Sequence, residues 1–231
     1  MSTMPQVVPS PSDPIELHTG DRMTREEFHL LYEDSPKHLK AELIGGTVYV
    51  ASPLGSLHGN NHLRLGVLFG IYEGNTPGVE AGDNTTILLG KDSEPQPDLY
   101  LRVLPERGGQ SKTDRRQYIV GAPELVAEIA HSSRAIDLHA KKEDYARYGV
   151  REYLVASLAD KRLYWFDFTT SRELSPDTDG VVRVHNFPGF WIHVEALFAH
   201  DFRRLMSALQ QGMDSPEHGA FIDRLNPAAP R

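Results

Sequence analysis

Four residues of this chain, Glu42, Asp98, Glu128 and Lys141, have the types and positions that suggest acid–base or metal chemistry. Glu128 is the most informative of them, because it interrupts the apolar run 125–130. A carboxylate in a protein core costs several kcal/mol unless it is paired with a cation or bound to a metal. The sequence therefore predicts a positively charged group close to Glu128.

Each of these residues also has an ordinary structural explanation. Glu128 could pair with an arginine or a lysine, or lie at an exposed strand end. Asp98 follows a proline, and a Pro-Asp pair before a strand usually bonds the local backbone in a turn. Lys141 lies four residues after Asp137, which is the spacing of a solvent-facing ion pair on a helix. Glu42 could be a surface residue of a hairpin, so no single residue decides the function.

The composition excludes several classes of protein. With 24 lysines and arginines against 32 aspartates and glutamates, the formal net charge is −8. A nonspecific DNA coater is not expected, because such binding draws on a cationic surface. Since the chain has no cysteine, a metal site is left to Asp, Glu and His. No apolar run approaches the roughly 18 residues of a membrane span and no signal-type N-terminus is present, so we expect a cytoplasmic protein.

The two ends of the chain differ in composition from its middle. Residues 1–20 contain four prolines among Ser, Thr and Asp, and residues 210–231 have a similar composition. Such segments bury little apolar surface and predict flexible tails. We therefore expect one folded domain over residues 21–209.

Local signals within this domain predict both helices and strands. A capping box at Thr24 and Glu27 starts a helix of about two to three turns, and Gly45-Gly46 joins two strands over 41–50. A second helix begins near His58. Further along, the pattern predicts a strand pair over 79–89, strands at 99–103 and 125–129, and a helix over 135–148. After this helix it predicts strands at 152–157, 162–168 and 181–187. A segment at 190–198 closes the core, and a helix through 205 follows. This order indicates an α/β or α+β fold with a mixed β-sheet flanked by helices.

Several motifs occur together in the order of a known family, and their joint spacing is more specific than any one of them. The match is carried by Met23–Phe28, Glu42-Leu43-Ile44 before Gly46, Ser52-Pro53 with His58, Pro97-Asp98, Pro123-Glu124-Leu125-Val126 leading to Glu128, and Asp137, Lys141, Tyr145 and Gly149–Tyr153. By these residues the chain resembles, from about 23 to 198, the Uma2 (DUF820) family of restriction-endonuclease-like proteins within the PD-(D/E)xK nuclease superfamily.

The resemblance implies a restriction-endonuclease-like core with a metal-dependent site for phosphodiester hydrolysis at one edge of the sheet. Asp98 and Glu128 would hold Mg²⁺ or Mn²⁺, the Ile129 carbonyl could complete the inner shell, and Glu42 would approach the metal or its water shell. Lys141 would orient and help deprotonate the attacking water, or stabilise charge on the phosphate. DNA is the implied partner. A homodimer is expected, because many folds of this class pair their active sites.

The chain departs from the superfamily pattern at two positions. The lysine expected two residues after the second acid is replaced by Ala130, so the resemblance assigns its role to Lys141 on the following helix. Where family members tend to have serine, the chain has His131, which could bond a phosphate, join the metal shell or cap the helix. His58 matches a family histidine to which the sequence assigns no role.

Two further segments have both a functional and a structural interpretation. The aromatic strand 163–168 could stack on bases, although packing in the core or in a dimer is favoured. The basic residues Arg107, Lys112, Arg115 and Arg116 could grip a phosphate backbone, although a solvated loop is favoured. The leading hypothesis is thus a Mg²⁺-dependent endonuclease for DNA. The alternatives are a noncatalytic binding or assembly module with the nuclease fold and a nuclease for RNA or damaged DNA.

Overall fold

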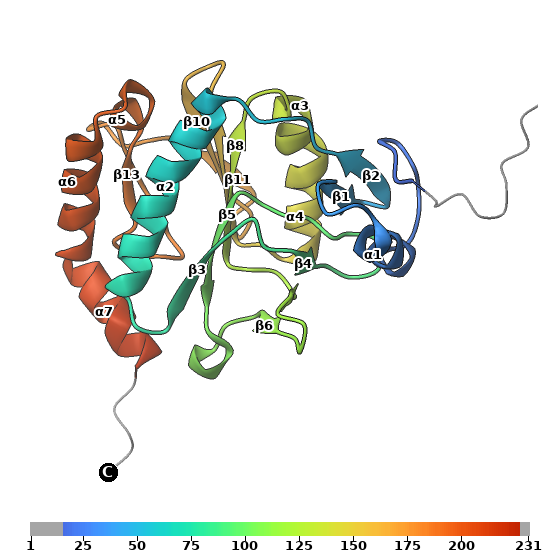
Figure 1. Cartoon of the computed structure of the whole chain (residues 1–231). Coiled ribbons are helices and arrows are strands. Elements are labelled where there is room, and N and C mark those ends of the chain that lie inside the picture. The colour runs from blue at the N-terminus through green and yellow to red at the C-terminus, as the bar shows by residue number, and fades with distance from the viewer. Residues whose placement is uncertain (1–15, 227–231) are drawn as a thin grey trace, which may run out of the picture.

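A six-stranded mixed sheet forms the centre of the computed structural model, which describes residues 16–226 (Figure 1). Its strands lie in the order β11 (Arg172–Leu174), β10 (Arg162–Asp167), β9 (Glu152–Ser157), β8 (Leu125–Ala130), β5 (Leu99–Val103) and β3 (Val79–Asp83). β8 and β9 are parallel, and all other neighbours are antiparallel. The connection from β8 to β9 must therefore cross one face of the sheet, and this crossover carries Lys141.

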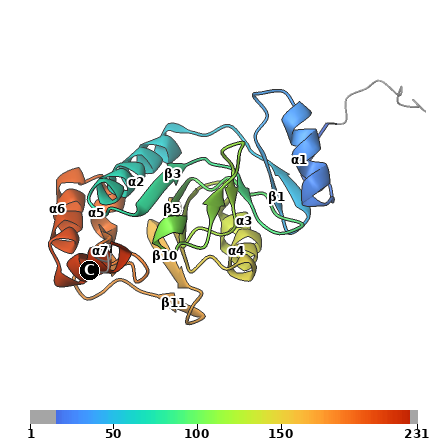
Figure 2. The same ribbon diagram turned by 90° about the horizontal axis from the view of Figure 1, so that it is seen from below.

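Helices cover both faces of the sheet (Figures 1 and 2). One face packs against α2 (Ser56–Gly74), α5 (Val194–Ala199), α6 (Phe202–Met213) and α7 (Pro216–Leu225). The crossover covers the other face and consists of α3 (Arg134–Ile136), the π-helical turn η2 (Asp137–Lys141) and α4 (Lys142–Tyr148). Gly149 ends α4 with a φ of +91°, a conformation that glycine adopts easily. Among residues 16–226, none of the helices is both long and apolar enough to cross a membrane.

The alternation of side chains along β8 decides which of its residues face each helical layer. Leu125 and Ala127 pack in the larger core cluster with α2, whereas Val126 and Ala130 pack in the smaller cluster with α4. Glu128 has the same parity as Val126 and Ala130, so its side chain points toward the crossover.

Smaller elements complete the structure. The hairpin of β1 (Ala41–Ile44) and β2 (Thr47–Val50) packs against α1 (Arg25–Asp34) around a third apolar cluster. Gly45 and Gly46 form the hairpin turn with φ of +55° and +76°, and Thr24 and Glu27 form the predicted capping box. The remaining elements are the small sheet of β4 (Ile87–Leu88), β7 (Ile119–Val120) and β6 (Lys112–Thr113), the pair of β12 (Val181–Arg183) and β13 (Trp191–His193), and the 3₁₀ turn η1 (Pro105–Arg107).

Most elements expected from the sequence are confirmed, and three need correction. The strand pair predicted over 79–89 is wrong, since β3 pairs with β5 and β4 pairs with β7. Asn84, at a φ of +48°, turns the chain out of the central sheet between them. The strand predicted over 181–187 ends at Arg183, because Phe187 enters the core from a turn instead. The last predicted helix is α6, which continues to Met213.

Folded structure extends beyond the tail boundaries predicted at residues 20 and 210. Residues 210–225 belong to α6 and α7 rather than to a tail, and Phe221 and Leu225 are buried in the main core. Pro216 does not break this segment, because it occupies the first turn of α7 behind the cap of Ser215. At the other end, Leu17 is buried against the hairpin. Residues 1–15 and 227–231 lie outside the described part of the chain.

Replacement of Phe221 by alanine tests whether the C-terminal helix is part of the core. Phe221 is 2% exposed and packs edge-to-face on Phe187. Phe221→Ala should lower the free energy of unfolding by about 3–5 kcal/mol, measured by urea denaturation. The control Asp223→Ala, at an exposed position of the same helix, should stay within about 0.5 kcal/mol. Equal stability of the two variants would contradict the packing of α7.

Candidate active site

A cleft of about 540 Å³ opens beside the crossover, the hairpin and the start of α2. All four residues singled out in the sequence, Glu42, Asp98, Glu128 and Lys141, line it. The antiparallel pairing of β5 and β8 brings the two central carboxylates together, because the residue before β5 lies opposite the fourth residue of β8. The hairpin supplies Glu42, and the crossover supplies Lys141.

Lys141 is buried among three carboxylates. Its Nζ lies 2.8 Å from Glu42 Oε2, 2.9 Å from Glu128 Oε1 and 3.9 Å from Asp137 Oδ1. Burial alone would lower the pKa of this ammonium, but the charges of Glu128, Glu42 and Asp137 outweigh it and hold the pKa well above its ordinary value. The interpretation of Lys141 and Asp137 as a solvent-facing pair is therefore wrong, since both side chains are buried.

Glu128 has the cationic partner that its sequence context predicts. Its Oε1 accepts hydrogen bonds from Lys141 Nζ and, at 3.0 Å, from the Tyr145 hydroxyl. Burial raises the pKa of the Glu128 carboxyl well above its ordinary value, and the nearby ammonium only partly opposes this shift. The sequence included Tyr145 in the family pattern without assigning it a role. Its position one helical turn after Lys141 brings both side chains to the same carboxylate.

Asp98 is held at the end of the sheet by contacts distant in sequence, not by a local turn. Its Oδ2 accepts a hydrogen bond from the backbone N–H of Ile129 at 2.7 Å, and its own N–H lies 3.4 Å from Glu128 Oε2. On its other side, His58 Nε2 lies 3.3 Å from Oδ2 and His62 Nδ1 lies 3.6 Å from Oδ1. Burial alone would raise the pKa of Asp98, but the hydrogen bond and charge of His58, with the Ile129 N–H, lower it.

The structure also places two residues that the sequence interpreted differently or missed. Glu42 is not an ordinary surface residue of the hairpin, because its Oε1 accepts the backbone N–H of Gln96 at 2.7 Å while Oε2 contacts Lys141. His62 was missed, although its spacing of four residues from His58 on a predicted helix was the signal that could have found it.

The two departures from the superfamily pattern have separate outcomes. Ala130 is fully buried on the same face of β8 as Glu128, and the lysine of the crossover reaches this carboxylate instead. His131 is exposed and lines the cleft. Within residues 16–226 it caps no helix, because α3 begins after Ser133 and that residue's hydroxyl donates to Asp137 Oδ2 at 2.6 Å.

The aromatic strand and the basic loop lie away from this cleft. Leu163, Trp165 and Phe166 are buried, which confirms core packing for much of β10. The basic residues of the loop, Arg107, Lys112, Arg115 and Arg116, are exposed, and none of them is among the described residues that line the cleft. This loop leaves the end of β5 opposite to Asp98.

The charge balance determines what the cleft can bind. Glu42, Asp98, Glu128 and Asp137 face one buried ammonium, so the site has more negative than positive charge. Burial is the largest cause of the raised pKa values of the Glu128 and Asp137 carboxyls, whereas the neighbouring carboxylates raise the pKa of the Lys141 ammonium against the effect of burial. Carboxylate oxygens arranged in this way suit a hard divalent cation such as Mg²⁺ or Mn²⁺.

Comparisons with known proteins agree with this geometry. The profile of the Uma2 family, described as "Putative restriction endonuclease", matches residues 25–195. Among solved structures, the chain is similar to a protein of Anabaena variabilis described as a "putative nuclease belonging to DUF820", with a TM-score of 0.57 and 14% identity. The similarity covers 73% of this chain and 95% of that one, and it shows a shared fold. No curated protein matches the chain.

The titration of Asp137 should make stability fall as the pH rises. Burial raises the pKa of Asp137 to about 6 in the folded protein, above its unfolded value of about 3.9. Between these two pH values the folded state binds more protons, so raising the pH costs at most roughly 3 kcal/mol of stability. In urea denaturation with EDTA, Asp137→Asn should gain stability relative to wild type between about pH 4 and 7. A difference that is independent of pH would contradict the shift.

Proposed function

Because the chain belongs to the Uma2 family, we propose that it is a metal-dependent endonuclease that hydrolyses phosphodiester bonds of DNA. The observation that carries this proposal is the convergence of Glu42, Asp98, Glu128 and Lys141 on one cleft. Carboxylates that hold a divalent cation, with a nearby ammonium, are suited to stabilise the charge of a phosphoryl transition state. The family and the shared fold support a nuclease; the substrate, the metal and the residue roles are our inference.

Asp98 and Glu128 are the residues that we assign to the metal. They are neighbours across the strand pair, Glu128 is buried and Asp98 is half-buried, and the excess of carboxylates around them fits a divalent cation. Glu42 lies across Lys141 from Glu128 and would contact the cation or its waters. The Ile129 carbonyl is a further candidate ligand, because the N–H of the same residue points to Asp98. A cation held there would withdraw charge from the phosphate and acidify a bound water.

Lys141 acts in this proposal as a fixed positive charge. The surrounding carboxylates favour its ammonium form, which has no lone pair to accept a proton. Of the two roles that the resemblance implies, stabilising charge on the phosphate and orienting the water therefore fits better than deprotonating the water. Its hydrogen bond to Glu128 also keeps this carboxylate in position at the cleft.

The substrate must overcome the acidity of the cleft. A phosphate group would be repelled by four carboxylates near one ammonium, and a bound cation removes this repulsion. Binding of DNA should therefore depend on the divalent metal.

We also propose that the protein forms a homodimer, which would place two cleavage sites on one duplex. Light scattering of the purified protein would test this oligomeric state.

The experiment is cleavage of supercoiled plasmid, single-stranded DNA and RNA by the purified protein with Mg²⁺, Mn²⁺ or EDTA. Nicking of the plasmid that requires metal supports the proposal. Preferential cleavage of RNA would indicate that the substrate is RNA and not DNA. An absence of cleavage by folded protein on all three substrates, including with Mn²⁺, would favour the alternative of a noncatalytic module with the nuclease fold.

Removal of either central carboxylate should abolish cleavage. Asp98→Ala and Glu128→Ala should each lower the cleavage rate by about 1,000-fold or more, because the cation loses a principal ligand. Circular dichroism and thermal unfolding report whether the fold is retained. The matched control is Glu152→Gln. Glu152 is a buried carboxyl group at the other end of the β8–β9 pair, and it accepts hydrogen bonds from the Trp165 side chain and the Asn186 backbone. If the Asp98 or Glu128 variant unfolds, the replaced carboxylate serves as a structural ion-pair partner and not as a metal ligand.

Lys141 should affect turnover more than metal affinity. Lys141→Ala removes the ammonium while leaving Asp98 and Glu128 in place, so the rate should fall by at least about 100-fold. Metal affinity, measured by calorimetry, should change less. Lys142→Ala is the control, because Lys142 lies over the Phe166 ring at 4.1 Å instead of among the carboxylates. An equal loss of rate in both variants would contradict the assignment of Lys141.

A further inference from the structure

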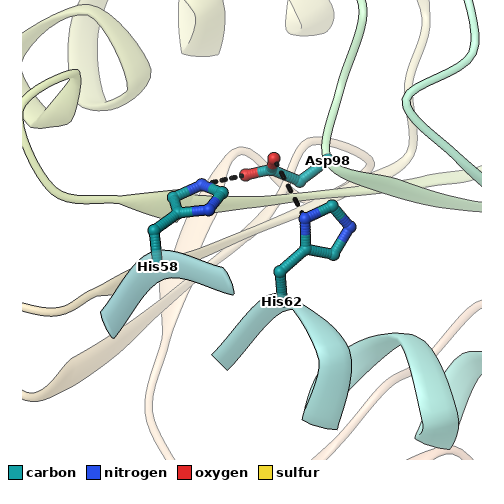
Figure 3. A group of neighbouring side chains, drawn as sticks. All are labelled: His58, His62 and Asp98. Atoms are coloured by element: carbon teal, nitrogen blue, oxygen red, sulfur yellow. Dashed lines mark ion pairs between the residues drawn. The ribbon is translucent and has the colours of Figure 1, made fainter. Parts of the chain in front are cut away.

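Two histidines of α2, His58 and His62, lie beside the Asp98 carboxylate. His58 and His62 lie one helical turn apart, and Figure 3 shows their rings directed toward the Asp98 carboxylate, with one carboxylate oxygen near each ring. We propose that His58, His62 and Asp98 form a binding site for a divalent transition-metal ion such as Zn²⁺. The site goes beyond the proposed nuclease centre, with which it shares only Asp98.

The distances between the three groups are compatible with a shared metal ion. One ligand atom from each residue lies within 4.8 Å of the other two. The nitrogen–oxygen separations of 3.3 and 3.6 Å are longer than the ordinary hydrogen bond of about 2.9 Å. Tetrahedral Zn²⁺ with bonds of about 2.0–2.1 Å places neighbouring ligand atoms about 3.4 Å apart. The two histidines approach different oxygens of Asp98, and the three side chains would have to draw together from within 4.8 Å to share one ion.

The surroundings of the His62 ring, but not those of the His58 ring, support the same inference. Among residues 16–226, neither of the outer ring nitrogens, His58 Nδ1 and His62 Nε2, makes a hydrogen bond. The remaining nitrogen of His62, Nε2, lies 3.4 Å from Asp83 Oδ1. A carboxylate beside the outer nitrogen of a metal-binding histidine is a common arrangement, because it orients the ring and fixes which nitrogen faces the metal. Asp83 has this position for His62.

The ligand types separate this site from the carboxylate cluster. Two imidazole nitrogens with one carboxylate oxygen favour Zn²⁺, Co²⁺ or Ni²⁺, whereas the oxygen-only cluster of Glu42, Asp98 and Glu128 suits Mg²⁺. Spacing of the histidines at i and i+4 places both on one face of α2, as a shared metal requires. The inference does not rest on nuclease activity, because it concerns binding by a different ligand set.

Titration with Co²⁺, whose visible absorption reports nitrogen coordination, tests the site directly. The wild-type protein in a buffer without Mg²⁺ should bind one Co²⁺ per chain with visible absorption bands, and Zn²⁺ should displace it. His58→Gln and His62→Gln should each weaken binding by at least about tenfold. The control His139→Gln changes an exposed histidine of the crossover that is not among the described residues lining the cleft, and it should bind as wild type does. Absence of binding, or equal binding by all three variants, would overturn the inference.

A second measurement avoids dependence on the folding of the variants. X-ray absorption spectroscopy of the wild-type protein loaded with one equivalent of Zn²⁺ should show scattering from two imidazole rings. A Zn²⁺ ion with fewer than two imidazole ligands would overturn the inference. The plasmid assay with Mg²⁺ tests the nuclease proposal separately. If the protein cleaves the plasmid but does not bind Co²⁺, the nuclease proposal is supported and this inference is wrong. If it binds Co²⁺ but does not cleave, this inference is supported and the nuclease proposal is not.

Discussion

The burial of Lys141 among Glu42, Glu128 and Asp137 is the constraint on which the arrangement of the cleft depends. The lysine belongs to the crossover, and its partners belong to the hairpin, to β8 and to the crossover itself, so the contacts join three parts of the chain. Removal of the ammonium would leave three neighbouring carboxyl groups, two of them buried, with little positive charge near them. The hairpin, although it packs in its own apolar cluster, is thereby tied to the central sheet.

The same contacts leave the cleft with more carboxyl groups than ammonium groups. Lys141 supplies one positive charge to this group of carboxylates, and burial, with smaller contributions from Glu42 and Asp98, raises the pKa of Asp137 to about 6. Asp98 differs, because the Ile129 N–H and His58 lower its pKa and keep it ionised. An ionised carboxylate next to carboxyls that hold protons more readily is an arrangement in which a metal can replace protons without a change in the fold.

The sheet topology supplies the positions at which these groups meet. Because β8 and β9 are parallel, their connection must cross the sheet, and the crossover passes over the face of β8 that carries Glu128. The π-helical turn Asp137–Lys141 lies directly over this carboxylate, and such turns are frequent at functional sites. On the other side of the sheet, α2 begins beside Asp98 and presents His58 and His62. One carboxylate thus lies between two different sets of possible metal ligands.

The sequence by itself determined most of the elements and the four candidate residues, because capping, turn and periodicity signals are local and because an acid within an apolar strand needs a partner. It also placed Lys141 on the helix after Glu128. Only the tertiary structure decided which groups meet: the pairing of β3 with β5, the contact of Glu42 with Lys141 and the approach of His62 to Asp98 join distant segments. The packing of Phe221 likewise depends on a core that composition does not reveal. Local signals cannot specify such contacts, because these contacts depend on how separate elements pack in space.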